Sequence, residues 1–72
     1  MVEKELDKRF GTIAVKKGFV TQEQLIQAFI IQVSENLEKG EHRLIGAILL
    51  DQGLMTIQQI DEVIGNFGNN RK

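Results

Sequence analysis

Apolar residues recur along this chain at the three- and four-residue spacing of an amphipathic α-helix, in four stretches separated by short turns. The pattern predicts helices over residues 4–17, 22–38, 43–52 and 57–65. No stretch alternates with period two, and no Asn-Gly or Asp-Gly pair joins β-rich runs. We therefore expect an all-α fold of four short helices in one small domain, residues 1–72, with a frayed tail at 68–72.

The chain contains an internal repeat with an offset of 35 positions, so that residues 9–32 correspond to residues 44–67. Most aligned pairs keep their apolar character, and five pairs are identical: Gly11/Gly46, Ile13/Ile48, Gly18/Gly53, Thr21/Thr56 and Gln24/Gln59. Each copy has the pattern of a helix, a glycine turn and a second helix. The repeat therefore predicts two tandem helical hairpins around one core.

The turn of each copy carries signals that end one helix and start the next. Gly18 and Gly53 are placed to end the first helix, because glycine adopts the left-handed conformation without a Cβ penalty. Thr21 and Thr56 are predicted N-caps, each followed three residues later by a glutamine that completes a capping box. The pairs with hydrophobic-staple spacing are Val20/Leu25 and Met55/Ile60.

Two glycines fall inside predicted helices, Gly11 in residues 4–17 and Gly46 in residues 43–52. A glycine within a helix costs about 1 kcal/mol relative to alanine. Its presence at the same place in both copies predicts that these two helices pack closely against each other.

The helix predicted over residues 22–38 has an apolar arc of about 200°, wider than the ~100° stripe that a surface helix needs. One stripe comprises Leu25, Ala28, Phe29 and Gln32, and a second comprises Ile26, Ile30, Val33 and Leu37. Either this helix is central and touches both the first and the fourth helices, or the second stripe meets another chain. Because so short a chain buries little apolar surface, we favour a protein partner or self-association.

Composition argues against an enzyme. The chain has no cysteine and one histidine, His42, which we expect in a solvent-facing loop. The sequence shows no catalytic triad, no metal-ligand spacing and no phosphate-binding glycine loop, so we expect no catalytic residue, metal or cofactor. The N-terminus is too charged for a signal peptide and no apolar run reaches membrane-spanning length, so we expect a cytoplasmic protein.

Helix–turn–helix DNA binding fits the outline of the repeat but not its residues. The second helix of that motif docks through apolar side chains, where the two copies have Gln24 and Gln27, and Gln59 and Glu62. Residues 21–38 contain no lysine or arginine for phosphate contacts, and the formal net charge is −1. Nucleic-acid binding is therefore disfavoured.

The repeat resembles the N-terminal domain of type II secretion and type IV pilus assembly ATPases, a family that includes the mannose-sensitive pilus type that binds cyclic di-GMP. The family pattern is RLG-x-x-L-x-x-x-G-x-I followed by two leucines and a closing glutamine. The first copy matches it at Arg9-Phe10-Gly11, Ala14, Gly18, Val20, Leu25, Phe29 and Gln32. The second copy departs from it: Leu44 stands at the arginine position, with Arg43 one residue early, and Phe67 at the glutamine position.

The resemblance implies a bacterial regulatory or protein-interaction module without the ATPase motor, and its candidate interaction surface is the stripe of Ile26, Ile30, Val33 and Leu37. The alternative that it implies is cyclic di-GMP binding at Arg9, Gly11 and Gln32, with Arg43 as a substitute contact. Two first-copy sites could complete such a site across a homodimer. Equally, Arg9 could be an exposed helix residue and Gln32 an interhelical hydrogen-bonding residue.

Overall fold

The computed structural model describes residues 2–69 and the side chains of residues 6–66. Four helices form, α1 (Val2–Lys16), α2 (Gln22–Lys39), α3 (Ile45–Asp51) and α4 (Ile57–Asn69), and the described residues contain no strand. The all-α prediction is confirmed, and every helix end lies within four residues of its expected position. Across residues 2–69, no helix combines the length and the apolar character needed to cross a membrane.

The C-terminal end is the largest departure from the predicted helix boundaries. Helix α4 continues to Asn69, four residues beyond its predicted end, and residues 70–72 of the predicted frayed tail 68–72 lie outside the described part of the chain. A single glycine costs a helix only about 1 kcal/mol, which is too little for Gly65 or Gly68 to end it.

The two glycine turns have matching conformations and hydrogen bonds. Gly18 and Gly53 have φ values of 79° and 76°, in the left-handed region that favours glycine. After each of them, the next amide donates to the carbonyl five residues back, Phe19 to Ala14 and Leu54 to Leu49, both at 3.0 Å. The local signals that predict these helix ends are confirmed.

Both predicted capping boxes form. Thr21 Oγ1 accepts from the Gln24 amide at 3.1 Å, and Gln24 Oε1 accepts from the Thr21 amide at 2.9 Å. The Thr56–Gln59 pair makes the same two bonds at 3.1 and 3.0 Å. Each pair satisfies two amides that a helix start would otherwise leave without partners.

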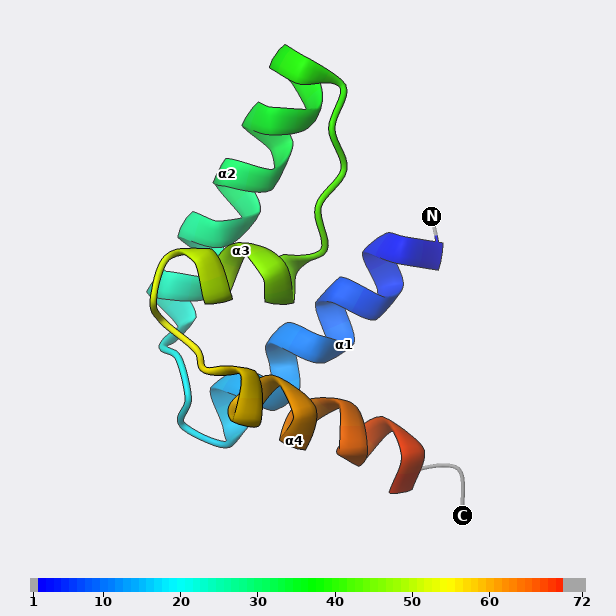
Figure 1. Cartoon of the computed structure of the whole chain (residues 1–72), viewed down its shortest axis with the longest axis vertical. Helices are drawn as coiled ribbons and strands as arrows, with labels where there is room; N and C mark the ends of the chain where they lie inside the picture. Colours follow the sequence, from blue (N-terminus) through cyan, green and yellow to red (C-terminus); the bar gives the residue numbers. More distant parts are fainter. Residues whose placement is uncertain (1, 70–72) are drawn as a thin grey trace.

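The two hairpins interlock around a shared core. Helix α1 packs against α2, α3 and α4, and α3 also packs against α2 (Figure 1). The buried apolar side chains come from both halves of the chain: Phe10, Ala14, Val20, Ala28, Ile45, Ile48, Leu49, Met55 and Val63. Since α3 is too short to bury its side chains alone, it depends on α1 and α2 for its position.

The two helix-interior glycines approach different helices. A Cβ at Gly46 would lie 3.1 Å from Phe10 Cζ, so α3 does pack closely on α1 as expected. A Cβ at Gly11 would lie 2.7 Å from both Cδ atoms of Leu25, which belongs to α2. The expectation that Gly11 faces α3 is therefore wrong. A glycine inside a predicted helix indicates that another helix packs closely there, but it does not identify that helix.

Helix α2 is not the central helix that one explanation of its wide apolar arc requires. It packs against α1 and α3 through one side, while its C-terminal end extends past the other helices, with the 40–44 connection running beside it (Figure 1). Gly40 ends α2 with φ 69°, its amide donating to Asn36 O at 3.0 Å. The second apolar stripe of α2 lies on the side of the helix away from this packing and is exposed.

Candidate interaction surface

The outer face of α2 carries four large aliphatic side chains in solvent. Ile26, Ile30 and Val33 are 49%, 51% and 50% exposed, and Leu37 is 79% exposed. We call these four residues the α2 seam. On the opposite side of the same helix, Ala28 and Gln32 are buried against the body of the protein. Four aliphatic side chains in one row form the kind of exposed patch that marks an interaction site.

The seam has the spacing of a coiled-coil interface. Its residues are separated by four, three and four positions, which keeps one edge of a helix facing a partner helix over nearly two heptads. In heptad terms Ile26 and Val33 occupy d positions, and Ile30 and Leu37 occupy a positions. The flanking e and g positions are all uncharged: Gln27, Phe29, Ser34 and Asn36. A groove of about 360 Å³ runs along this face between Ile26 and Ser34.

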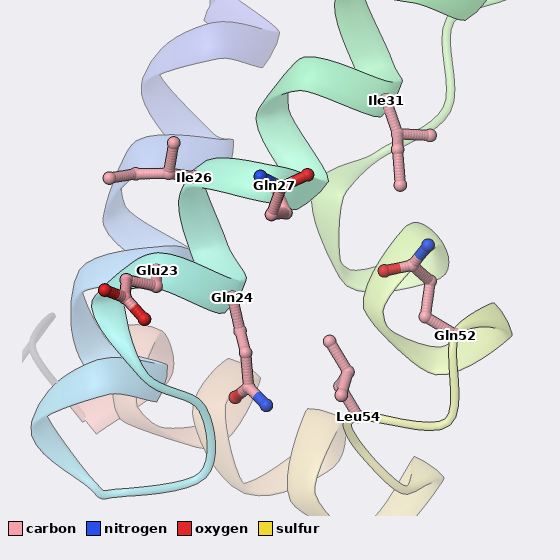
Figure 2. Close-up of a pocket in the computed structure, with 7 residues that line it drawn as sticks. All are labelled: Glu23, Gln24, Ile26, Gln27, Ile31, Gln52 and Leu54. Carbon is pink, nitrogen blue, oxygen red and sulfur yellow. The ribbon is translucent and has the colours of Figure 1, made fainter.

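A second hollow adjoins the N-terminal end of the seam, between α2 and the turn after α3 (Figure 2). Its volume is about 620 Å³, and Ile26 contributes to both this hollow and the seam groove. Figure 2 shows Gln24 and Leu54 extending into the lower part of the space, with Ile31 above and Gln52 to one side. Gln24 is already committed to the α2 capping box. The lining of the hollow is mixed, because Glu23, Gln27 and Gln52 also border it, so it adds a partly polar margin to the surface around Ile26.

A buried polar cluster lies on the inner face of α2. Gln32 is 5% exposed, and its Nε2 donates to Asp7 Oδ2 at 2.7 Å and to Arg43 O at 2.8 Å. Asp7 is 3% exposed, and its Oδ1 accepts from the Ile45 amide at 3.0 Å. The cluster ties α1, α2 and the start of α3 together. Of the two roles left open for Gln32, the interhelical hydrogen bonds are present.

Asp7 is the residue that sequence reasoning missed. It serves as a remote cap for α3, whose N-cap residue Leu44 makes no side-chain hydrogen bond to the helix start. A helix that begins Leu44-Ile45 has no local acceptor for its first amides, and this lack is the signal that a distant acceptor is needed. The sequence does not say which acidic residue supplies it.

Arg43 is held by carboxylates. Its Nε donates to Glu35 Oε1 at 3.0 Å and a terminal nitrogen donates to Glu35 Oε2 at 2.6 Å, while the other terminal nitrogen lies 3.7 Å from Asp51 Oδ2. The hydrogen bonds that Arg43 donates lower the pKa of Glu35 below its ordinary value, and because the Glu35 carboxylate accepts them, the same bonds raise the pKa of Arg43. This bidentate pair fastens the 40–44 connection to α2.

The four candidate dinucleotide-binding residues do not gather in one place. Gln32 and Arg43 are neighbours, but their polar groups bond to the protein itself. Arg9 is exposed on α1, and it lies two residues from Asp7, which on a helix is about 200° around the axis. Since Asp7 faces Gln32, Arg9 points to another side. Gly11 is buried against Leu25 and serves close packing.

His42 lies exposed in the 40–44 connection, as expected. Among the described side chains, no three His, Cys, Asp or Glu residues form a group able to hold a metal ion. Compared with known protein families, with curated proteins and with solved structures, the chain matches none of them.

Proposed function

We propose that this protein is a non-enzymatic interaction module that docks on another protein helix through the α2 seam. The observation that carries the proposal is the seam itself, four aliphatic residues at heptad spacing whose side chains are half or more exposed. Nine large apolar side chains of the described residues are exposed, and four of them form this one row on α2, whereas the other five are spread over three helices and the 40–44 connection. Leaving a whole row in water is costly for so short a chain unless a partner covers it.

The polar groups of the molecule support a structural role in place of catalysis. The groups that converge, Asp7 with Gln32 and Glu35 with Arg43, are paired with one another and hold α3 and its connection in position. Groups that bond to each other in this way fix a fold, and they do not take part in the seam. The resemblance to the N-terminal domains of secretion and pilus ATPases supports the same class of function, a helical regulatory or docking module.

The chemistry of the seam describes its partner. The residues beside it, Gln27, Phe29, Ser34 and Asn36, carry no formal charge, so they select neither an acidic nor a basic surface. A helix that presents its own apolar heptad stripe fits this surface best.

The test is an affinity capture from a lysate of the source cell with three versions of the purified chain as bait. I30E/V33E places two carboxylates in the middle of the seam, while Ile57→Glu places one on α4, where Ile57 is 63% exposed and outside the seam. We expect the wild type and Ile57→Glu to retain the same protein, and I30E/V33E to lose it. If every protein retained by the wild type is also retained by I30E/V33E, the proposed function is wrong.

Cyclic di-GMP binding at Arg9 stays a prediction implied by the resemblance. Calorimetry with the wild type and with Arg9→Ala decides it, and either the absence of heat at high micromolar ligand or equal affinity of the two proteins eliminates it. DNA binding is disfavoured, and we expect no salt-dependent retardation of duplex DNA.

A further inference from the structure

We infer that the partner of the α2 seam is a second copy of this chain, and that two α2 helices pair antiparallel. The inference rests on the proposed function, since it names the occupant of the same surface. It follows from three features of the described residues: the heptad spacing, the uncharged flanks and the position of Glu23.

The heptad spacing makes the seam complementary to itself. An antiparallel pair that sets Ile26 opposite the partner's Leu37 also sets Ile30 opposite the partner's Val33. All four seam residues are then covered in each copy by the same kind of side chain. The seam runs from Ile26 to Leu37, which lie 11 positions or about 16 Å apart along the helix, and a two-fold axis midway between Ile30 and Val33 relates the copies.

The flanks of the seam allow two identical surfaces to meet. In a homodimer, a charged residue at an e or g position would lie near the same charged residue, or another flanking residue, of the second chain, and like charges there would repel. Here Gln27 and Ser34 on one side, and Phe29 and Asn36 on the other, introduce no such charge. The body of the protein lies on the opposite side of α2, with Ala28 and Gln32 buried, so it leaves the seam accessible to a second helix.

Glu23 decides the direction of the pair. It lies three positions before Ile26, at the a position that continues the seam toward the N-terminus. In a parallel pair Glu23 would face the partner's Glu23, and the two like charges would repel. In the antiparallel register Glu23 faces the partner's Gly40, which has no side chain to oppose it. Antiparallel pairing also sets the two helix dipoles in opposite directions.

Sedimentation and light scattering on the purified chain test the assembly. We expect the wild type and Ile57→Glu to have the mass of a dimer, and I30E/V33E to have the mass of a monomer. I30K/V33E sets opposite charges against each other only in the antiparallel register, so we expect it to dimerise at least about tenfold more tightly than I30E/V33E. Circular dichroism checks that each variant is folded.

Engineered cysteines test the direction, because the natural chain has none. In the antiparallel pair, an equal mixture of I26C and L37C chains forms a mixed disulfide dimer under mild oxidation. I26C alone does not, since its two sulfurs start about 16 Å apart, beyond the Cα separation of ~7 Å that a disulfide tolerates. Crosslinking of I26C alone indicates a parallel pair and overturns the antiparallel arrangement.

The remaining outcomes separate this inference from the proposed function. A wild type that is monomeric up to millimolar concentration, or a dimer that survives in I30E/V33E, overturns self-association through the seam. If the monomer still captures a different protein that I30E/V33E loses, the interaction module stands with another occupant. If neither a second copy nor another protein needs the seam, both proposals fail.

Discussion

The inner and outer faces of α2 each carry an exception to the usual distribution of polar and apolar side chains. On the inner face Gln32 is buried, and on the outer face Ile30 and Leu37 are exposed to solvent. Buried polar groups and exposed apolar rows are the informative exceptions to ordinary burial. The inner exception is resolved within the chain by hydrogen bonds, whereas no described residue of the chain resolves the outer one. The inner face therefore contributes to stability, and association through the outer face is what we propose.

The inner face tolerates polar burial because its atoms are paired. No described buried side-chain nitrogen or oxygen is without a hydrogen-bond partner. Asp7 makes two of these bonds to two different elements, so its loss affects more than one contact. Substitution of Asp7 therefore removes two of the hydrogen bonds of the inner face at once.

Asp7→Ala should destabilise the fold more than replacing either Gln32 or Gln27 of α2 with alanine. It removes the acceptor of the Ile45 amide at the start of α3 and one acceptor of Gln32, leaving buried donors unpaired. We expect a loss of about 2–4 kcal/mol in the free energy of unfolding, measured by urea denaturation. The matched control is Asp61→Ala on the exposed side of α4, which should change it by less than about 0.5 kcal/mol. Equal effects of the two substitutions would contradict the capping role of Asp7.

Two glutamines on α2 compare the faces directly. Gln32→Ala leaves Asp7 Oδ2 and Arg43 O without their donor, and should cost about 1–3 kcal/mol in the free energy of unfolding. Gln27→Ala, at an exposed position of the same helix, should leave it unchanged within about 0.5 kcal/mol. The same denaturation experiment measures both. If Gln32→Ala changes the free energy of unfolding as little as Gln27→Ala does, the hydrogen bonds of Gln32 contribute no net stability.

The parts of this fold that the sequence predicts are those set by neighbours in the chain. The Gly18 turn and the Thr21–Gln24 capping box join residues a few positions apart, so residue identity and spacing suffice. The apolar seam is equally local, since helical periodicity alone places Ile26 and Ile30 on one edge. Whether that edge is covered depends on packing, and for this reason periodicity leaves two explanations of the wide apolar arc open.

The sequence indicates an interhelical hydrogen bond for Gln32, but the partners on the inner face could not be predicted because they are remote in the chain. The Asp7–Gln32 bond joins residues 25 positions apart and the Asp7–Ile45 bond joins residues 38 apart. No periodicity links such positions. The repeat is misleading here, because it makes Gly11 and Gly46 equivalent in sequence although they pack against different residues, Leu25 and Phe10. Arg43 shows the same limit, since its pairing with Glu35 depends on how the 40–44 connection returns along α2.

The Glu35–Arg43 pair, beside the buried cluster of Asp7 and Gln32, makes the stability of the fold depend on pH. The pKa of Glu35 in the folded protein lies below its ordinary value of 4.5, so its ionised form stabilises the fold. That stabilisation is fully present above the ordinary pKa and is lost as pH falls through the lowered one. We expect Glu35→Gln to lower the thermal midpoint at neutral pH and to differ less from the wild type as pH is reduced below 4.5.

Glu38→Gln is the control for removing a carboxylate from an exposed site of α2. Differential scanning calorimetry across this pH range follows all three proteins. If the difference between the wild type and Glu35→Gln is the same at every pH, the paired carboxylate is not the group that titrates.

The outer face should show the smallest effect on the folded monomer and a growing effect with concentration. Leu37 is 79% exposed, so Leu37→Lys removes almost no contact within the chain and should change the free energy of unfolding by less than about 0.5 kcal/mol in dilute solution. If two seams pair, the wild type gains stability as its concentration rises, because only folded chains can associate into the dimer. Leu37→Lys should gain less, so the thermal midpoints of the two proteins diverge on concentration. If the thermal midpoints of the two proteins instead stay the same distance apart from dilute to concentrated solution, Leu37 has no partner in solution. The two faces of α2 would then differ only in what they contribute to the stability of the monomer.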